Sequence, residues 1–241
     1  MSDELGGVEL RVLTTADELA ALPPFEHRIW GAGDAVSVNM LVALIAEGGV
    51  AIGAFDGDEI VGAVCGFRTH EPWVLHSHYL AVDPRARRLG LGVALKQEQR
   101  RWCLERGLTA MRWTFDPLQL ANAHLNLRAL RAVGVSYHVD HYGTLGGING
   151  TLPSDRLTVQ WDLTGARPRP TGELAVDVPV ADADDIAASN DVALHARHVI
   201  REALAPRLAN GWIVVDVDRA QRRYWLAPPS STTSARTTSA S

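Results

Sequence analysis

The chain has 241 residues, of which 46% are hydrophobic and 21% charged, and its formal net charge is −5. These values are typical of a globular protein with its own core and exclude a chain that is disordered throughout. The acidic balance and the lack of a long Lys/Arg run argue against a nucleic-acid binder, because phosphate contacts need a basic surface. The two cysteines, Cys65 and Cys103, cannot form a disulfide framework and fit a reducing compartment.

Neither a signal peptide nor a membrane span is visible in the sequence. Met1–Gly7 is acidic and lacks an apolar stretch. The longest apolar run, Met40–Ala46, is far shorter than the ~20 residues that span a bilayer. We therefore expect a cytoplasmic protein with no membrane partner and no nucleic-acid partner.

The first part of the chain predicts strands and short helices around a hairpin. Two apolar runs on either side of Asp56-Gly57-Asp58 indicate the hairpin, because Asp-Gly is a strong hairpin turn. The predicted strands are Val8–Leu13, Val50–Phe55, Ile60–Arg68 and Trp73–Val82, and the predicted helices follow Thr15 and cover Phe25–Trp30 and Val38–Ala46.

The second part predicts a long helix from the glycine-rich turn at Gly90 to Arg106, and a helix capped by Asn122. The remaining predicted elements are strands over Thr109–Phe115, Ala132–His138, Arg156–Leu163 and Leu174–Val178, a helix over Asp182–Leu208 and a hairpin over Trp212–Leu226. Strictly alternating βα units are absent, so we expect an α+β fold with a mixed, mostly antiparallel central sheet flanked by helices. We expect a first domain over residues 1–163, a linker over 164–171, a small C-terminal strand–helix–hairpin extension over 172–227, and a disordered tail over 228–241.

The turn between the fourth predicted strand and the long helix has the composition of an anion cradle. It reads Arg87-Arg88-Leu89-Gly90-Leu91-Gly92. Glycine lets the backbone approach a ligand closely, and the first amides of a helix point unpaired N–H groups at it. The pattern is neither a dinucleotide fingerprint nor a P-loop. The alternative is a simple glycine turn that starts a helix.

Together with the preceding Leu80-Ala81-Val82-Asp83-Pro84, this turn resembles motif A of the GCN5-related N-acetyltransferases (GNATs). The resemblance extends over about residues 8–163. The motifs Leu75-His76-Ser77-His78, Trp113-Thr114-Phe115-Asp116-Pro117-Leu118, Asn122, Tyr142-Gly143 and Asp155-Arg156 are similar to a bacterial and archaeal branch of predicted acetyltransferases. Some members of that branch transfer succinyl groups to amino acids.

This resemblance implies that acetyl-CoA or another acyl-CoA is the co-substrate. The turn residues Arg87, Arg88, Leu89, Gly90, Leu91 and Gly92 would bind the pyrophosphate of CoA, the backbone of Leu80, Ala81 and Val82 the pantetheine arm, and Asn122 its thiol end. The reaction would move an acetyl or succinyl-type group to the amine of a small molecule or amino acid by direct attack. Two alternatives stay open: an acyl-CoA sensor without catalysis, and a metal-dependent enzyme that uses His76 and His78.

Strand alternation predicts the catalytic candidates. It places His76, His78, Leu80 and Val82 on one face and Ser77, Tyr79 and Ala81 on the other. His78 stands where many family members carry a carboxylate, so it is the candidate base, with a histidine bonded within the sheet as the alternative. The helix position where the family often has an acidic tyrosine falls on Leu127 or Leu130. The proton for the thiolate would then come from Tyr142, from Tyr137 or from water.

The remaining candidates concern the acceptor. His76, Trp113 and Phe115 would line a substrate pocket, or belong to the core. Arg156 would bind a substrate carboxylate, or form an ion pair with Asp155. We expect no resident metal, because the possible third ligands beside His76 and His78 (His70, Glu71 and Asp116) do not form a pattern. A homodimer is left open by the aromatic C-terminal hairpin.

Overall fold

The computed structural model describes residues 6–31, 35–143, 153–165, 171–177 and 190–229, and for residues 87–89 and 190 it describes the backbone alone. Residues 230–241 of the expected tail and residues 166–170 of the expected linker lie outside these ranges. So does the glycine-rich segment after Gly143.

In the described residues, a single sheet of ten strands runs through the molecule in the order β1-β2-β3-β4-β5-β7-β6-β9-β10-β8. The strands are β1 (Glu9–Leu13), β2 (Val50–Asp56), β3 (Glu59–Arg68), β4 (Val74–Val82), β5 (Ala110–Phe115), β6 (Val133–His138), β7 (Arg156–Asp162), β8 (Leu174–Asp177), β9 (Ile213–Asp218) and β10 (Arg223–Ala227). All neighbouring pairs are antiparallel except β4 and β5. The predicted α+β class with a mostly antiparallel sheet is confirmed.

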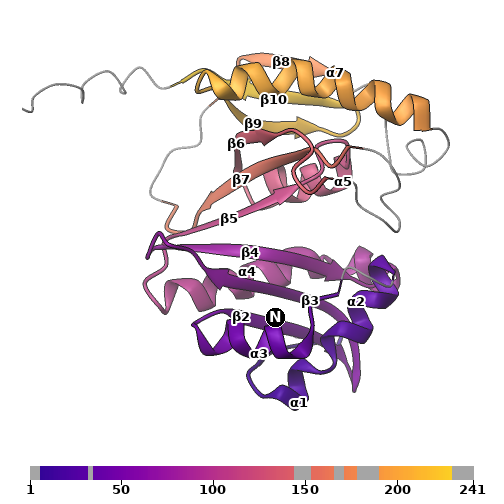
Figure 1. Ribbon diagram of the computed structural model, residues 1–241, viewed down its shortest axis with the longest axis vertical. Coiled ribbons are helices and arrows are strands. Elements are labelled where there is room, and N and C mark those ends of the chain that lie inside the picture. Colours follow the sequence, from indigo (N-terminus) through magenta and orange to yellow (C-terminus); the bar gives the residue numbers. More distant parts are fainter. Residues whose placement is uncertain (1–5, 32–34, 144–152, 166–170, 178–189, 230–241) are drawn as a thin grey trace, which may run out of the picture.

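Helices cover both faces of the first half of the sheet (Figure 1). The helical elements are α1 (Ala16–Leu19), α2 (Leu22–Trp30), α3 (Val38–Ala46), the 3-10 helix η2 (Pro84–Leu89), α4 (Leu91–Leu104), α5 (Leu120–Ala123), the π-helical η3 (His124–Ala129) and α7 (Asn190–Ala209). One apolar cluster joins α1, α2 and α3 to β2 and β3 around Phe25 and Leu41. A larger cluster joins α4, α5, η3 and α7 to the sheet around Leu95, Leu127 and Ile200.

Two helix starts differ from the sequence-based expectation. Pro23 and Pro24 stand in the first turn of α2, where proline is tolerated because its missing N–H has no helical partner there. Asn122 does not cap a helix, because α5 begins after Gln119 and Asn122 is already inside it. The amide of Asn122 is therefore not used as an N-cap.

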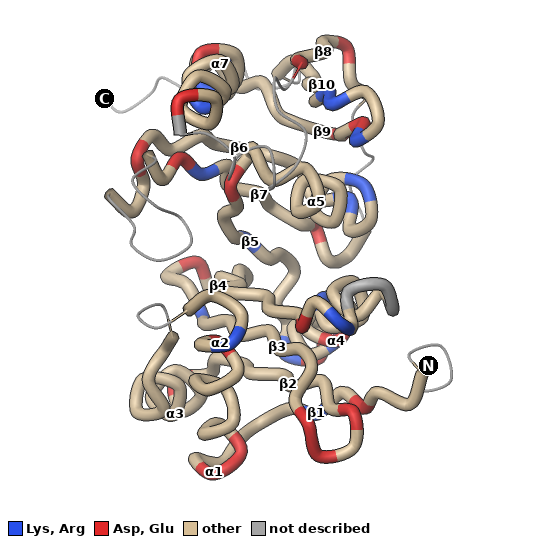
Figure 2. The backbone as a smooth tube through the Cα atoms, turned by 90° about the vertical axis from the view of Figure 1, so that its right-hand side faces the viewer, with Lys and Arg blue, Asp and Glu red and all other residues tan. Residues whose placement is uncertain are grey.

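The C-terminal strands continue the sheet of the first part. β6 pairs with β9 at Gly134 and Val214. A Cβ atom on Gly134 would lie 2.9 Å from Cβ of Val214, so this close contact requires glycine. Figure 2 shows the resulting succession, with α1 and β1 at one end of the molecule and α7, β8 and β10 at the other.

Two carboxylates, one of them buried, tie α7 to the centre of the sheet. Asp155 is fully buried and accepts hydrogen bonds from Arg201 (both 2.8 Å), from the Tyr137 hydroxyl (2.7 Å) and from the Asp140 amide (3.0 Å). Asp116, which directly follows β5, accepts two hydrogen bonds from Arg197, at 2.5 and 2.8 Å. Such two-pronged arginine–carboxylate contacts fix orientation as well as distance.

In the part of the chain that the structure describes, no helix combines the length and the apolar character needed to cross a membrane.

We expect Asp155→Asn to lower the free energy of unfolding by about 3 kcal/mol, because the change leaves Arg201 without its buried counter-charge. The matched control is Asp177→Asn, which breaks the exposed ion pair with Arg223 and should cost less than about 1 kcal/mol. Urea unfolding at neutral pH measures both. Equal losses in the two variants would contradict this role of Asp155.

The same contact has a pH dependence. Burial alone would raise the pKa of Asp155, but its hydrogen bonds, led by the one from Arg201, lower it on balance. A carboxyl whose folded pKa is lowered stabilises the protein above its unfolded value of ~3.9 and loses this contribution as the pH falls through the folded value. The stability difference between the wild type and Asp155→Asn should therefore shrink below about pH 4.

Candidate functional site

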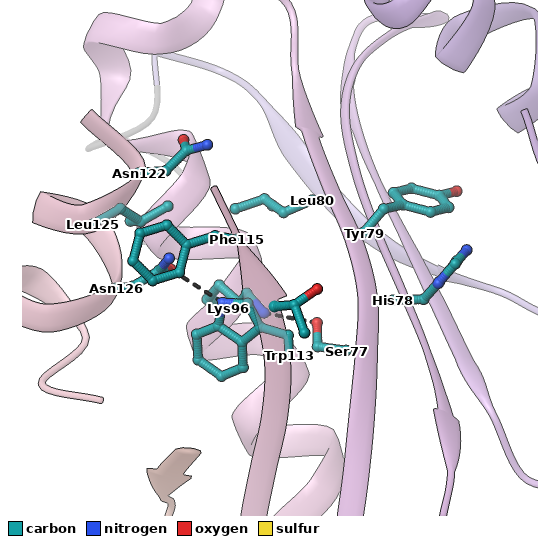
Figure 3. A pocket seen from close by; sticks show the side chains of 11 residues that line it. Ser77, His78, Tyr79, Leu80, Lys96, Trp113, Phe115, Asn122, Leu125 and Asn126 are labelled. Carbon is teal, nitrogen blue, oxygen red and sulfur yellow. Dashed lines mark hydrogen bonds between the residues drawn. The ribbon is translucent and has the colours of Figure 1, made fainter. Parts of the chain in front are cut away.

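The site is built where β4 and β5 separate. These strands, both wholly described, pair at Val74–Ala110, Leu75–Met111 and His76–Arg112 only, and beyond that point they diverge. A cavity of about 110 Å³ lies in the divergence. Its lining residues come from β4, α4, β5, α5 and η3 and are Ser77, His78, Tyr79, Leu80, Lys96, Trp113, Thr114, Phe115, Asn122, Leu125 and Asn126 (Figure 3).

A β-bulge at His78 changes which face the β4 side chains share. Cys65 of β3 pairs with Tyr79 and Gly66 pairs with Ser77, so His78 is an extra residue on β4. An extra residue shifts the alternation of side chains by one position. The predicted strict alternation through β4 is therefore wrong.

On the α4 side of β4 lie Ser77, which is hydrogen-bonded to α4, and Leu80 and Val82, which pack against its first turn. On the other side, His76 and His78 stand with Tyr79 rather than with Leu80. Figure 3 shows His78 and Tyr79 pointing away from the Lys96 and Trp113 side chains. The bulge thus places the two histidines on the face of the sheet that points away from α4, while Ser77 and Leu80 point towards α4.

The two histidines belong to an aromatic group on this second face. The His76 ring stacks on Phe67, with centroids 4.8 Å apart, and lies 6.3 Å from the His78 ring. Burial first, and the neighbouring positive charges second, lower the pKa of His76 to about 4. Burial also lowers the pKa of His78. Both imidazoles are therefore neutral near pH 7, the form in which a histidine accepts a proton.

Lys96 is a buried residue of the cavity that the sequence-based reasoning missed. It is 2% exposed, and its Nζ donates to Oγ of Ser77 at 2.6 Å and lies 3.7 Å from the centroid of the Trp113 ring. Burial lowers its pKa to about 7. The sequence contained one indication that Lys96 is buried: it follows Leu95 directly and so lies at the edge of the apolar stripe of α4.

The predicted anion cradle lies beside the cavity. Gly90 has φ +70°, a left-handed conformation that favours glycine, and it is the N-cap of α4. A Cβ on Gly92 would be 3.7 Å from Leu80 and from Leu125, two residues that line the cavity. The first amides of a helix have no helical acceptor, so those of Leu91 and Gly92 are free to bind an anion.

Of the remaining candidates for donor binding, two have described side chains, and both are buried. Leu91 and Ala81 are buried core residues, on opposite faces of the sheet. The side chains of Arg87, Arg88 and Leu89 lie outside the described part. Nearby, Arg85 is already engaged by Asp83 and Glu59, at 2.8 and 2.6 Å.

The aromatic candidates are core and cavity residues at once. Trp113 and Phe115 are each 6% exposed and both line the cavity. The indole Nε1 of Trp113 donates to Oδ1 of Asn126 at 3.2 Å. Asn122 lines the same cavity from an exposed position. Trp113 and Phe115 are thus core residues that also line the cavity, and their contact with a substrate stays a prediction.

Tyr142 and Arg156 lie together beyond β5. The Tyr142 hydroxyl is 3.2 Å from Oγ1 of Thr114, and the Arg156 guanidinium lies 5.3 Å from the centre of the Tyr142 ring. The expected ion pair between Asp155 and Arg156 is wrong, because the Asp155 carboxylate binds Arg201 and Arg156 donates to the Asp155 backbone carbonyl. No carboxylate among the described residues pairs with Arg156.

The other candidates for proton transfer and metal binding are already engaged. Tyr137 donates to Asp155, and burial raises its pKa. Glu71 pairs with Arg112 at 2.8 Å, and Asp116 with Arg197. Within the described ranges, no three His, Cys, Asp or Glu side chains gather in a way that could hold a metal ion.

Residues 18–128 match the model of the acetyltransferase (GNAT) family. Among solved structures, an N-acetyltransferase from Staphylococcus aureus is similar with a TM-score of 0.55 and 11% identity, over 65% of this chain and 98% of that one. The ribosomal-protein-S18-alanine N-acetyltransferase from Escherichia coli has a TM-score of 0.53 and 17% identity, over 65% and 94%. An aminoglycoside 6'-acetyltransferase type Ii has a TM-score of 0.51 and 17% identity, over 67% of this chain and 99% of that one. These structures share the fold, and no curated protein matches the chain.

We expect His76→Phe to remove part of the acid sensitivity of the protein. The unfolded chain binds a proton at His76 near pH 6.5, whereas the folded protein resists it down to about pH 4. A histidine whose folded pKa is lowered therefore costs stability as the pH falls through this window, by about 2 kcal/mol near pH 5. Urea unfolding at neutral pH and near pH 5 measures it. Parallel pH dependence of wild type and variant would refute the assignment.

Proposed function

We propose that the chain, whose residues 18–128 match the GNAT acetyltransferase family model, transfers an acetyl or succinyl-type group from CoA to the amine of a small molecule or amino acid. One observation carries the proposal. The cavity between β4 and β5 adjoins the glycine start of α4, so a site for an acyl thioester lies next to a site for an anion.

The donor would be held by backbone groups. Beyond His76, no strand among the described residues pairs with β4 on its β5 side, so the edge of Leu80, Ala81 and Val82 would be available to the amides of a pantetheine arm. The amides of Leu91 and Gly92 would receive the pyrophosphate, with Arg87, Arg88 and Leu89 in the same turn. Asn122 would contact the thiol end of the arm.

The chemistry needs an amine, a base and an acid. The amine nitrogen attacks the thioester carbonyl carbon, the new C–N bond forms, the C–S bond breaks, and one proton must leave nitrogen while another reaches sulfur. His78 is our candidate base, because it is neutral near pH 7 and stands on the face of β4 opposite α4. Among the acids expected from the sequence, Tyr142 is the candidate that reaches the cavity, because its hydroxyl lies 3.2 Å from Oγ1 of the cavity residue Thr114.

The acceptor would enter from the face that carries His76 and His78. Arg156 supports an acceptor with a carboxylate, because its guanidinium has no carboxylate partner among the described residues and lies beside Tyr142. Arg112, by contrast, is already neutralised by Glu71. A small amino acid carries both an amine and a carboxylate and matches this arrangement, with His76 as a further wall on that face. Trp113 and Phe115 would wall the site from the α4 side.

The first test is calorimetric binding of CoA, acetyl-CoA and succinyl-CoA to the purified protein. We expect CoA to bind and one thioester to bind more tightly, which would identify the donor for an amine screen. Binding of none of the three would refute the proposed function. Binding without turnover across the amine screen would favour the acyl-CoA sensor instead.

We expect Arg156→Gln to lower kcat/KM about 10- to 100-fold for amines that bear a carboxylate, because a charge-assisted hydrogen bond is lost. Amines without a carboxylate should react as they do with the wild type. The matched control is Arg223→Gln, an arginine on β10 paired with Asp177. A loss of the same size for every amine would contradict carboxylate binding by Arg156.

A further inference from the structure

The cavity between β4 and β5 contains a buried lysine that has no counter-charge. Lys96 projects from α4, and within the described residues no carboxylate pairs with it. Its two contacts are the Ser77 hydroxyl and the face of Trp113. An ammonium group without a carboxylate partner is costly to bury, so its presence in a cavity indicates a use.

The surroundings of Lys96 are polar or aromatic, and none of them is an anion. From β4, Ser77 accepts the hydrogen bond of Lys96 and donates its own proton to Oε1 of Gln99 at 2.8 Å. From α4, Cys103 stays a neutral thiol, since burial raises its pKa to about 12. His76 lies near enough for Lys96 to lower its pKa.

The remaining neighbours are Trp113 of β5 and Asn126 of η3, which are hydrogen-bonded to each other. Burial outweighs a smaller opposing effect of Cys103 and lowers the pKa of Lys96 to about 7, where an ammonium group both holds and releases a proton. The Nζ atom uses one N–H for Ser77 and has others for the cavity that it lines.

We propose that Lys96 is the acid that protonates the sulfur of CoA as it leaves. This inference rests on the proposed function. It assigns to a residue of α4 the protonation of the thiolate, which Leu127 and Leu130, both buried in the core, cannot perform. It also replaces Tyr142 as the acid, because Tyr142 lies with Thr114 and Arg156 beyond β5, whereas Lys96 lines the cavity from α4.

The acyl transfer balances in protons and electrons. When the C–S bond breaks, its electron pair stays on sulfur, and a proton moves from Nζ of Lys96 to that sulfur. The products are the CoA thiol and a neutral lysine. The proton released by the acceptor nitrogen passes to His78 or water on the opposite face, and a solvent proton restores Lys96 after CoA has left. One proton leaves nitrogen and one reaches sulfur.

The test is a pH titration of the thiol of CoA bound to the full chain, followed by the ultraviolet absorbance of the thiolate. If Lys96 and the thiol share a proton, they titrate as a coupled pair. We expect part of the thiolate signal to appear near pH 7, where Lys96 titrates, in the wild type. In Lys96→Met it should appear in one step at or above the ordinary thiol value of ~8.5.

The protein itself does not obscure this signal. Burial raises the pKa values of Cys65 and Cys103 to about 12, so both stay protonated over the measured range. Lys96→Met should fold, because replacing an unpaired buried charge by an apolar chain of similar length is neutral or stabilising. Arg101→Met, which removes an exposed positive charge from the same helix outside the cavity lining, is the matched control and should keep the wild-type curve.

The outcomes separate the two proposals. Identical thiolate curves for wild type and Lys96→Met, at equal CoA affinity, would overturn the role of Lys96 and leave the proposed function standing. A curve shifted in Arg101→Met as far as in Lys96→Met would also overturn it, because the loss of any positive charge from α4 would then explain both. If CoA binds to none of the proteins, the proposed function fails and this inference fails with it.

Discussion

The early end of pairing between β4 and β5 is the constraint on which the rest of the site depends. Backbone N–H and C=O groups inside a protein need partners, so strands that part in the middle of a sheet leave groups for water or a ligand. Here the separation begins after His76 and Arg112 and is filled from one side by Lys96 and Trp113. The cavity is therefore a break in the hydrogen bonding of the sheet, supported by packed side chains.

The bulge at His78 adds a second consequence to this break. Without the extra residue, His76, His78 and Leu80 would share a face, and the histidines would stand on the side of α4 and the glycine turn. With it, the imidazoles turn to the opposite face while Leu80 stays against the first turn of α4. One inserted residue thus gives the site two distinct sides, which the proposed function assigns to an anionic donor and to an acceptor.

Much of the fold was predictable, because each long element has a local cause. The hairpin of β2 and β3 follows from Asp56-Gly57-Asp58, and α4 follows from its glycine start and apolar stripe. The bulge was not predictable, since nothing in the residue types of β4 distinguishes a continuous strand from one with an inserted position. For the same reason, the faces of His76 and His78 had to come from the pairing of β3 with β4.

The residues missed by sequence reasoning are those whose partners are distant in the chain. Lys96 reads as one more charge on an amphipathic helix until Ser77 and Trp113 are placed around it. An ion pair of Asp155 with its neighbour Arg156 was one of two alternatives from the sequence, but Arg201 of α7 binds Asp155 from 46 positions away. Short-range patterns find elements and turns, whereas ion pairs of this kind depend on how those elements are packed.

The junction of β6 and β9 has a consequence for how the protein can be divided. A version that stopped after β7 would leave the outer edge of β6 uncovered, with Gly134 adding no side chain to protect it. Uncovered strand edges recruit other strands, so such a fragment would tend to associate edge to edge with its copies. The same edge would also let two separately produced halves of the chain associate through β6 and β9. The sheet would then support complementation between the two fragments.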